Sequence, residues 1–293
     1  MTTEPVSDQE AIRKAETLLE ACSWIRRFRD RITVIKLGGS AMEDPASLRA
    51  TLQDVLFMET AGMRPVLVHG GGKPIDRAMA AAGLTPKKVQ GRRYTDEATL
   101  GIVVRVLKDE INPGLVAQLA EAGGRAAGAA DVLEGEPLTV PGDDGRPIDL
   151  GRVGAVTRVG ADRLAAALGA GTIPVLPSLA RDPRGWLNVN ADTAAAAVAG
   201  ALKAEACYFL TDTPGVLRDV REPGSLVPRL TASESRHLIA TGVIAGGMIP
   251  KVEACFEALA AGAGRAVILD GRDPHALLGG FVSDRAAGTE IVP

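Results

Sequence analysis

The sequence predicts an α/β protein with a mainly parallel central sheet, on the strength of three observations. Short apolar segments alternate with longer segments of helical periodicity along much of the chain. Two early apolar segments end in glycine runs, at Gly38-Gly39 and at Gly70-Gly71-Gly72. A third apolar segment leads into Asn-Val-Asn-Ala-Asp at 188–192, directly before an alanine-rich stretch. Loops at the carboxyl ends of strands bind ligands in such sheets, so these motifs also predict where the site lies.

The N-terminal part of the chain alternates expected helices and strands. A helix is expected over 7–29, because Ser7 and Glu10 have capping-box spacing and apolar residues then recur every three or four positions. The proline at position 74 suits the first turn of a helix. The elements expected after the first helix are a strand at 32–35, a helix over 46–61, a strand at 65–68 and a helix from 74 to about 82.

The middle and the C-terminal part are expected to continue the same alternation after an irregular stretch. Residues 95–121 have a helical pattern that Pro113 should kink or split. Clusters of Gly, Pro and Asp in 131–160 predict a hairpin flap on the sheet edge. The elements expected after the flap are a strand at 172–176, a hairpin over 178–189, a helix over 191–202, a strand at 207–210, helices over 232–241 and 248–261, and a last strand at 266–269.

Length and composition limit the classes of partner. A chain of 293 residues has room for about two domains or for one continuous sheet. Two lobes that share one sheet fit the pattern better than two separate domains joined by a flexible linker. The 33 Lys and Arg residues nearly balance the 36 Asp and Glu residues, which argues against binding to nucleic acid or to an anionic membrane. Aromatic residues make up only 3% of the chain, too few for a base-stacking surface. No apolar stretch reaches the roughly 18 residues of a membrane span.

The chain ends and the cysteines predict a cytoplasmic protein. Residues 1–10 are polar and acidic, without the apolar core of a secretory signal. Cys22, Cys207 and Cys255 are odd in number and far apart, and they have no metal-ligand spacing. A reducing compartment therefore fits better than a disulfide framework, and no protein-bound metal site is expected.

The glycine runs and two lysines suggest a site that holds anions. Glycine permits close approach of backbone N–H groups to phosphate, although such runs alone can also be simple tight turns. Lys36 at the end of an apolar strand would be unfavourable without an anionic partner, and Lys251 near a helix start opposes the helix dipole. A solvated side chain remains the alternative for Lys251. Gly72-Lys73 is not a Walker motif, because its first glycine and its final Ser or Thr are missing.

Three polar residues near these motifs have structural interpretations as well. His69 at a strand end is expected to be structural rather than catalytic. Asn188 or Asn190 could cap the helix that follows, and Asp192 could complement its dipole instead of serving in a site.

Taken together and in order, the motifs resemble those of the acetylglutamate kinases, within the amino-acid kinase family. The resemblance runs from about residue 24 to 292. It is carried by Lys-Leu-Gly-Gly at 36–39, Val-His-Gly-Gly-Gly at 68–72, Asn-Val-Asn-Ala-Asp at 188–192, Leu-Thr-Asp-Thr-Pro-Gly-Val-Leu at 210–217 and Gly-Gly-Met-Ile-Pro-Lys-Val-Glu-Ala-Cys at 246–255.

The resemblance implies the amino-acid kinase fold, which is an open αβα sandwich, here with an added N-terminal helix at 1–30 that would serve in oligomerisation. It implies an N-terminal lobe, 31–190, that binds N-acetyl-L-glutamate, and a C-terminal lobe, 191–293, that binds ATP with Mg²⁺. The implied reaction is ATP-dependent phosphorylation of the γ-carboxylate to an acyl phosphate, the second step of arginine biosynthesis. The implied partner is a second copy of the chain, in a dimer or a hexamer.

Site residues follow from the resemblance position by position. The resemblance implies that Lys36 and Lys251 act on the transferring phosphoryl group and that Asp192 orients them. It implies substrate binding by Gly71, Gly72, Arg93 and Asn188, and nucleotide binding by Gly38, Gly39, Thr211 and Asp212. A carboxylate nucleophile has a reference pKa of about 4.3, so it is ionised at neutral pH and requires no general base. It requires charge neutralisation and in-line placement, which these residue types can supply.

Some positions depart from the family pattern. Residues 126–131 lack the glycine-rich sequence expected there, so the edge near the flap is expected to differ. The helix at 7–29 resembles the one that interlaces dimers into a hexamer in arginine-inhibited members. At arginine-site positions, however, Trp24 replaces Tyr, Ala206 replaces Lys and Gly280 replaces Glu. Assembly and feedback are therefore expected to be separate in this chain.

Two alternatives to the acetylglutamate reaction stay open. One is an amino-acid kinase for aspartate, glutamate, carbamate or a nucleoside monophosphate, against which Arg93 and Asn188 argue. The other is a catalytically silent metabolite sensor or assembly subunit, against which Lys36, Asp192 and Lys251 argue.

Overall fold

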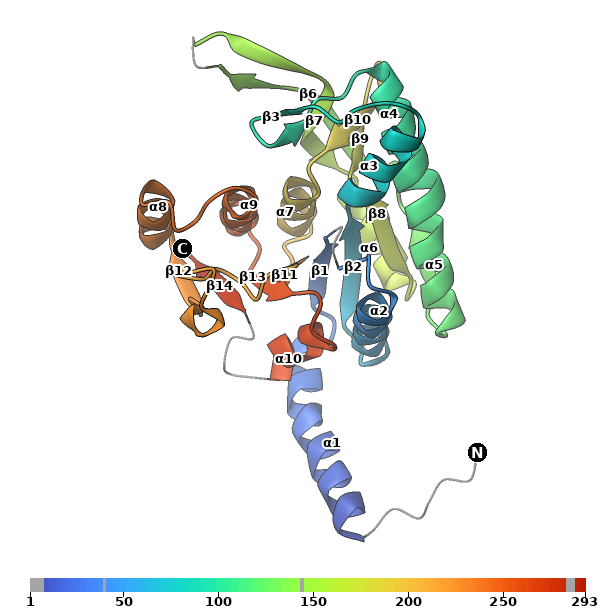
Figure 1. Ribbon diagram of the computed structural model, residues 1–293. Coiled ribbons are helices and arrows are strands. Elements are labelled where there is room, and N and C mark those ends of the chain that lie inside the picture. The colour runs from blue at the N-terminus through green and yellow to red at the C-terminus, as the bar shows by residue number, and fades with distance from the viewer. Residues whose placement is uncertain (1–7, 39–40, 143–144, 283–287) are drawn as a thin grey trace.

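A computed structural model describes residues 8–38, 41–142, 145–282 and 288–293 and contains a central sheet of eight strands between two layers of helices (Figure 1). The strand order is β12-β14-β13-β11-β1-β2-β8-β5. The strands are β1 (Ile32–Leu37), β2 (Arg64–His69), β5 (Ala126–Gly128), β8 (Ile173–Pro177), β11 (Ala206–Thr211), β12 (Arg229–Thr231), β13 (Ala266–Asp270) and β14 (Thr289–Val292). All pairings from β13 to β5 are parallel, whereas β14 runs antiparallel to β13. The prediction of a mainly parallel α/β sheet is confirmed.

The alternation of side chains along the strands divides the core into two layers. In β1, Val34 packs with the cluster beneath one helical layer, whereas Ile35 and Leu37 pack with the cluster beneath the other. The first layer contains α6 (Ala161–Gly169), α7 (Ala191–Ala201), α8 (Ala232–Ala240) and α9 (Met248–Ala260). The second contains α2 (Pro45–Thr60), α5 (Asn112–Glu121) and α10 (Ala276–Val282). By the same period of two, Lys36 lies on the Val34 face and points toward α7.

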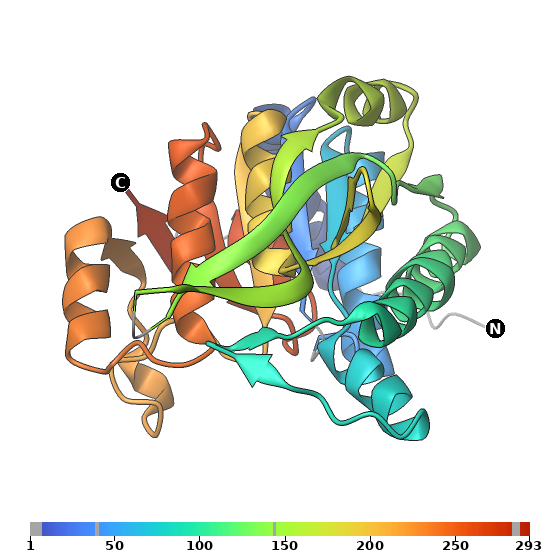
Figure 2. The same cartoon turned by 90° about the horizontal axis from the view of Figure 1, so that it is seen from above.

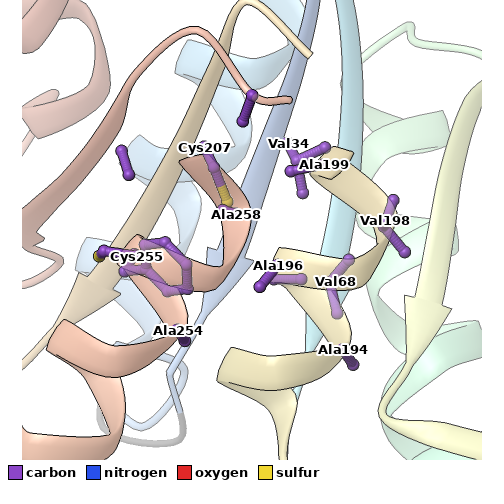
Figure 3. Close-up of a cluster of buried hydrophobic side chains, with 14 of the residues drawn as sticks. Val34, Val68, Ala194, Ala196, Val198, Ala199, Cys207, Ala254, Cys255 and Ala258 are labelled. Atoms are coloured by element: carbon purple, nitrogen blue, oxygen red, sulfur yellow. The ribbon is translucent and has the colours of Figure 1, made fainter. Parts of the chain in front are cut away.

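Helices α7 and α9 pack closely against each other over the first face of the sheet. Their contact surfaces consist largely of alanine, as Figure 3 shows for Ala196, Ala254 and Ala258. A Cβ atom added to Gly200 in α7 would lie 2.2 Å from the Cβ atom of Ala261 at the end of α9, so only glycine permits this approach. The small side chains therefore bring the two helices together along their length.

A second, smaller sheet covers the carboxyl end of the central sheet. It contains β6 (Leu133–Pro141), β7 (Pro147–Val159), β9 (Leu179–Asp182) and β10 (Gly185–Val189), and it closes on itself in the order β10-β7-β6-β9. The hairpins expected within 131–160 and over 178–189 are both present. Figure 2 shows that the β6–β7 hairpin passes over α7 toward α9, so it lies above the sheet and not along its edge as expected.

The segment between β2 and β5 contains a helix with an unexpected wide turn. Helix α3 (Gly72–Ala81) is followed by a short hairpin of β3 (Lys88–Val89) and β4 (Arg92–Arg93), and then by α4 (Glu97–Val104). Instead of a kink, a π-helical segment, η1 (Arg105–Ile111), connects α4 to α5 directly before Pro113. Proline lacks the N–H group that an α-helical turn requires, and the wider turn accommodates this loss.

Helix α6 and strand β5 were not among the expected elements, and the other differences lie near the C-terminus. The strand at 266–270 is not the last one, because β14 pairs beyond it and β12 pairs with β14. Helix α10 and a short 3₁₀ helix, η2 (Pro223–Ser225), were not expected either. None of the described helices is long and apolar enough to span a membrane.

Helix α1 (Asp8–Phe28) stands apart from the body of the molecule (Figure 1). Within it only Phe28 is buried, while Ile12, Leu18 and Leu19 are 58%, 69% and 72% exposed. An amphipathic helix this exposed leaves its apolar side chains uncovered within one chain.

Candidate active site

A cavity of about 600 Å³ lies at the carboxyl ends of β1 and β2, below the β6–β7 hairpin. Strand β1 lies between β2, which follows it in the chain, and β11, which comes much later. Open α/β sheets bind ligands at such a point, where the strand order changes direction. Six residues that the sequence singled out line this cavity: Lys36, Gly71, Gly72, Arg93, Asn188 and Asp192. The fold thus brings together residues that are up to 156 positions apart in the chain (192 minus 36).

Lys36, Asp192 and Lys251 form one ion-paired cluster. Lys36 Nζ lies 2.8 Å from Asp192 Oδ1, and Lys251 Nζ lies 3.1 Å from Asp192 Oδ2. The Lys36 and Asp192 side chains are only 6% and 7% exposed, and that of Lys251 is 19% exposed. Two ammonium groups and one carboxylate leave the cluster with one net positive charge, which suits an anion in the adjoining cavity.

Burial and pairing act in opposite directions on the pKa values of this cluster. Burial lowers the pKa of Lys36 below its usual value, although the carboxylate of Asp192 opposes this effect. Burial alone would raise the pKa of Asp192, but the charges of Lys36 and Lys251 outweigh it and hold that pKa below its usual value. Asp192 is therefore ionised at neutral pH and favours the charged form of Lys36.

Helix N-termini add further positive potential at the cavity. Asn190 caps α7, since its Oδ1 accepts hydrogen bonds from the backbone N–H groups of Asp192 and Thr193 at 2.7 and 3.2 Å. Asn190 is thus the capping residue, and both Asn188 and Asn190 line the cavity. Helix α3 begins without a side-chain cap, and the N–H group of Gly72 in its first turn lies at the cavity, where it can bind a ligand. Helix α9 also lacks a side-chain cap, but its first two N–H groups, of Met248 and Ile249, donate to the carbonyl oxygens of Ala245 and Gly246.

Two of the glycines at the strand ends, Gly38 and Gly71, are closely packed, whereas Gly72 is not. A Cβ atom on Gly71 would lie 2.7 Å from both Leu107 Cδ2 and Ile111 Cδ1, and one on Gly38 would lie 2.7 Å from the carbonyl oxygen of Leu210. Gly72 has open space around it and lines the cavity. Gly38 is not among the cavity-lining residues, and Gly39 lies outside the described residues.

Thr211 and Asp212, which the sequence associated with nucleotide, lie outside this cavity at the end of β11. Thr211 is buried, and its hydroxyl donates a 3.2 Å hydrogen bond to Asp212 Oδ1. Since β11 pairs with β1, both residues lie at the same edge of the sheet as Lys36.

Arg93 is held at the mouth of the cavity by α3. Its Nη2 lies 2.5 Å from Asp76 Oδ1 and donates a 3.3 Å hydrogen bond to the carbonyl oxygen of Gly72. The Arg93 side chain is 11% exposed, whereas that of Asp76 is 42% exposed. The guanidinium therefore lies next to Gly72, where a planar fork suits a carboxylate.

His69 is structural, as expected. It is fully buried at the end of β2, where its Nδ1 lies 3.1 Å from the carbonyl oxygen of Gly70 and its Nε2 lies 3.1 Å from Asn112 Nδ2. These partners fit a neutral ring that donates from Nδ1 and accepts at Nε2. Burial lowers the pKa of His69 to about 4, so the ring stays neutral at physiological pH.

Sequence reasoning missed three further side chains at the cavity. Arg92 and Glu257 line it from β4 and from α9, and their opposite charges attract across it. Thr95 lies behind it and contacts Arg93 and Asn188. The sequence could have indicated Thr95, because it stands two residues after Arg93 and residues two apart in an extended segment lie on the same face. The described part of the chain has no group of three or more His, Cys, Asp or Glu side chains placed to hold a metal ion.

Comparison with known proteins shows the family of this chain. Residues 31–270 match the family described as the amino acid kinase family. The chain belongs to the amino acid kinase family. It is 38% identical over 285 residues to an acetylglutamate kinase of Akkermansia muciniphila, with 96% of each chain covered. It is 42% identical over 292 residues to an acetylglutamate kinase of Methanocaldococcus jannaschii, with 96% of this chain and 97% of the relative covered.

A solved structure supports the same fold. N-acetylglutamate synthase from Neisseria gonorrhoeae, in complex with coenzyme A and N-acetyl-glutamate, superposes with a TM-score of 0.84 at 28% identity, covering 95% of this chain and 63% of the synthase chain. The predicted resemblance to the acetylglutamate kinases is confirmed, and so is the predicted amino-acid kinase fold.

Proposed function

We propose that this protein is an acetylglutamate kinase, which transfers the γ-phosphoryl group of ATP to the γ-carboxylate of N-acetyl-L-glutamate in arginine biosynthesis. The observation that carries the proposal is the buried Lys36–Asp192–Lys251 cluster beside the cavity. Acetylglutamate kinases cover nearly the whole chain at about 40% identity and support the same substrate. We place the enzyme in the cytoplasm, where ATP and amino-acid precursors are available.

The amino-acid substrate is proposed to occupy the cavity in the N-terminal lobe, 31–190. Its α-carboxylate pairs with Arg93, its amide contacts Asn188, and the backbone of Gly71 and Gly72 orients its side chain. The γ-carboxylate then lies near Lys36. This carboxylate is already ionised and attacks the γ-phosphorus in line with the departing oxygen of ADP.

The nucleotide is proposed to bind the C-terminal lobe, 191–293, over the ends of β1 and β11. Gly38, Gly39, Thr211 and Asp212 are the proposed contacts. Lys251 and the N-terminus of α9 face the transferring phosphoryl group, and Lys36 faces it from the other side, so the net positive charge of the cluster stabilises the transition state.

Magnesium is proposed to enter with ATP. The described residues contain no cluster of three or more metal-binding side chains, which fits an ion that is held mainly by the phosphate oxygens of ATP. When bound, Mg²⁺ would neutralise charge on the phosphates. Asp192 is committed to the two lysines and keeps them oriented.

A hydroxamate assay with MgATP tests the reaction directly, because hydroxylamine traps acyl phosphates. We expect turnover with N-acetyl-L-glutamate and little with L-glutamate, L-aspartate or carbamate, since a charged ammonium group would be poorly placed at Asn188 and the glycine backbone. Comparable kcat/KM values for the free amino acids would contradict the assignment. A complete lack of turnover with all substrates would instead favour a silent sensor.

The exposed helix α1 supports a homo-oligomer. Its apolar side chains Ile12, Leu18 and Leu19 are uncovered within one chain, and Arg26 and Arg27 at its end are available for charged contacts. We propose that α1 packs against α1 of another copy and so joins dimers into a larger assembly.

A further inference from the structure

The geometry around Thr95 points to a positioning residue that sets which atom of Asn188 faces the substrate. Thr95 is completely buried and lies outside the cavity wall. Its backbone is fixed on both sides, because its N–H donates to the carbonyl oxygen of Leu150 at 3.1 Å and its own carbonyl oxygen accepts from Arg152 N–H at 2.6 Å. The side chain therefore has little freedom to move.

The hydroxyl of Thr95 connects the two substrate-binding side chains. Oγ1 lies 2.9 Å from the carbonyl oxygen of Arg93 and 3.0 Å from Asn188 Nδ2. A carbonyl oxygen can only accept, so the single hydroxyl hydrogen of Thr95 is donated to Arg93. Oγ1 can then only accept from Asn188, and the amide of Asn188 must turn its Nδ2 toward Thr95.

This orientation leaves Asn188 Oδ1 for the cavity. No hydrogen bond to Oδ1 is formed by the described residues. The opposite rotamer would place Oδ1 against the acceptor face of Thr95 Oγ1, with two oxygens and no hydrogen between them. Asn188 thus presents its Oδ1 as an acceptor while Thr95 binds one of the two Nδ2 hydrogens, an arrangement that suits a ligand with a neutral N–H group.

We propose that Thr95 makes the site specific for an N-acylated α-amine by holding Asn188 as a hydrogen-bond acceptor. The inference rests on the proposed function and adds a physical basis for its substrate class. A secondary amide donates one hydrogen to Asn188 Oδ1. An ester in the same place has no hydrogen to donate and sets its oxygen against Oδ1.

The test compares N-acetyl-L-glutamate with its oxygen isostere, O-acetyl-L-2-hydroxyglutarate, and follows the release of ADP from MgATP, because hydroxylamine would itself cleave the ester. For the wild-type enzyme we expect kcat/KM for the amide to exceed that for the ester by at least about a hundredfold, because a site built to bind an N–H group rejects an analogue without it. Equal kcat/KM values would overturn the inference without any variant. If the amide is not turned over at all, the proposed function fails instead.

Two substitutions at Thr95 separate positioning from packing. Thr95→Val keeps the shape and the backbone bonds but removes the hydroxyl, which frees Asn188 to rotate. We expect KM for the amide to rise about tenfold, with kcat within about threefold of wild type, and the amide-to-ester ratio to fall about tenfold. Thr95→Ser retains the hydroxyl and should restore the wild-type ratio.

Thr99→Val is the matched control, since it also removes a buried hydroxyl but one that bonds to Asp96. We expect it to lower the melting temperature while the amide-to-ester ratio stays unchanged. A wild-type ratio in Thr95→Val, or an equal fall of the ratio in Thr99→Val, would overturn the positioning role.

Discussion

Replacement of Lys251 by methionine removes one charge from the proposed catalytic cluster of Lys36, Asp192 and Lys251, while Asp192 remains paired. Lys36 stays 2.8 Å from Asp192, so the cluster changes from one net positive charge to neutral. The loss of one preorganised charge-stabilising donor lowers kcat by roughly 10²–10³, which corresponds to about 2.7–4 kcal/mol of transition-state stabilisation. We expect KM for N-acetyl-L-glutamate to change by less than about threefold, because the proposed substrate contacts of Arg93 and Asn188 are retained.

The same substitution should leave the fold intact. The Lys251 side chain is 19% exposed, and its loss removes one charge-assisted hydrogen bond, worth about 1.5–3 kcal/mol before solvent screening. Steady-state rates from the hydroxamate assay and a thermal melt measure the two effects separately. Lys73→Met is the control, because this lysine near the cavity is 59% exposed and pairs with Glu43. A kcat near the wild-type value in Lys251→Met would refute the transition-state role, and a large loss of kcat in Lys73→Met would revive the rejected Walker interpretation.

Three further predictions concern binding, pH and assembly. Arg93→Lys should raise KM for N-acetyl-L-glutamate about tenfold with little change in kcat, because a planar fork is replaced by a point charge; a change confined to kcat would contradict this. Burial lowers the pKa of His69 from 6.5 to about 4, so its neutral ring contributes stability that is fully present above pH 6.5 and is lost as the pH falls toward 4. By pH 5 the loss is about 2 kcal/mol, and urea unfolding at pH 7 and 5 should show it in wild type and not in His69→Gln. Deletion of residues 1–29 should reduce the assembly to a dimer in light scattering, and L-arginine should inhibit neither form below a millimolar.

The catalytic edge of the fold could be predicted from the sequence because its signals are local. A buried lysine at the end of an apolar strand and a glycine run after a strand are each visible within a few residues, and the parallel sheet then places them at one edge. The same holds for Lys251, whose position in the first turn of α9 follows from the Gly-Gly pair before it.

The closed sheet and the C-terminal edge could not be predicted in this way. The pairing of β10 with β7 joins Asn188 to Val153, and nothing in either segment specifies the other. Strands β12 and β14 have three and four residues, too few to establish an alternating pattern. Their pairing depends on the long-range fold, as does the contact of Thr95 with Asn188.

The structure shows the surroundings of residues 206 and 280, two of the positions where the sequence departs from the arginine-inhibited members of the family. Ala206 is fully buried at the start of β11, and a Cβ atom on Gly280 would lie 3.5 Å from both Tyr208 and Leu269. Residues 206 and 280 therefore present no charge, in line with the expected loss of arginine binding. His275 is committed to Asp54, with Nδ1 2.6 Å from Oδ1, and Glu290 to Arg265 at 2.8 Å. His275 and Glu290 are two polar residues near the C-terminus that could replace the missing contacts to arginine, but each already has a partner within the chain.

The geometry of the Lys36–Asp192–Lys251 cluster depends on residues that have no functional group. Asp192 and Lys251 belong to different helices, and their 3.1 Å contact requires that the N-termini of α7 and α9 lie side by side. At the other end of the same helix pair, Gly200 and Ala261 approach so closely that one extra methyl group would have to displace a helix. A rigid helix transmits such a displacement along its length, so the small residues between α7 and α9 set the separation of the charges. The close packing of alanine and glycine between α7 and α9 therefore supports the geometry of the proposed catalytic cluster.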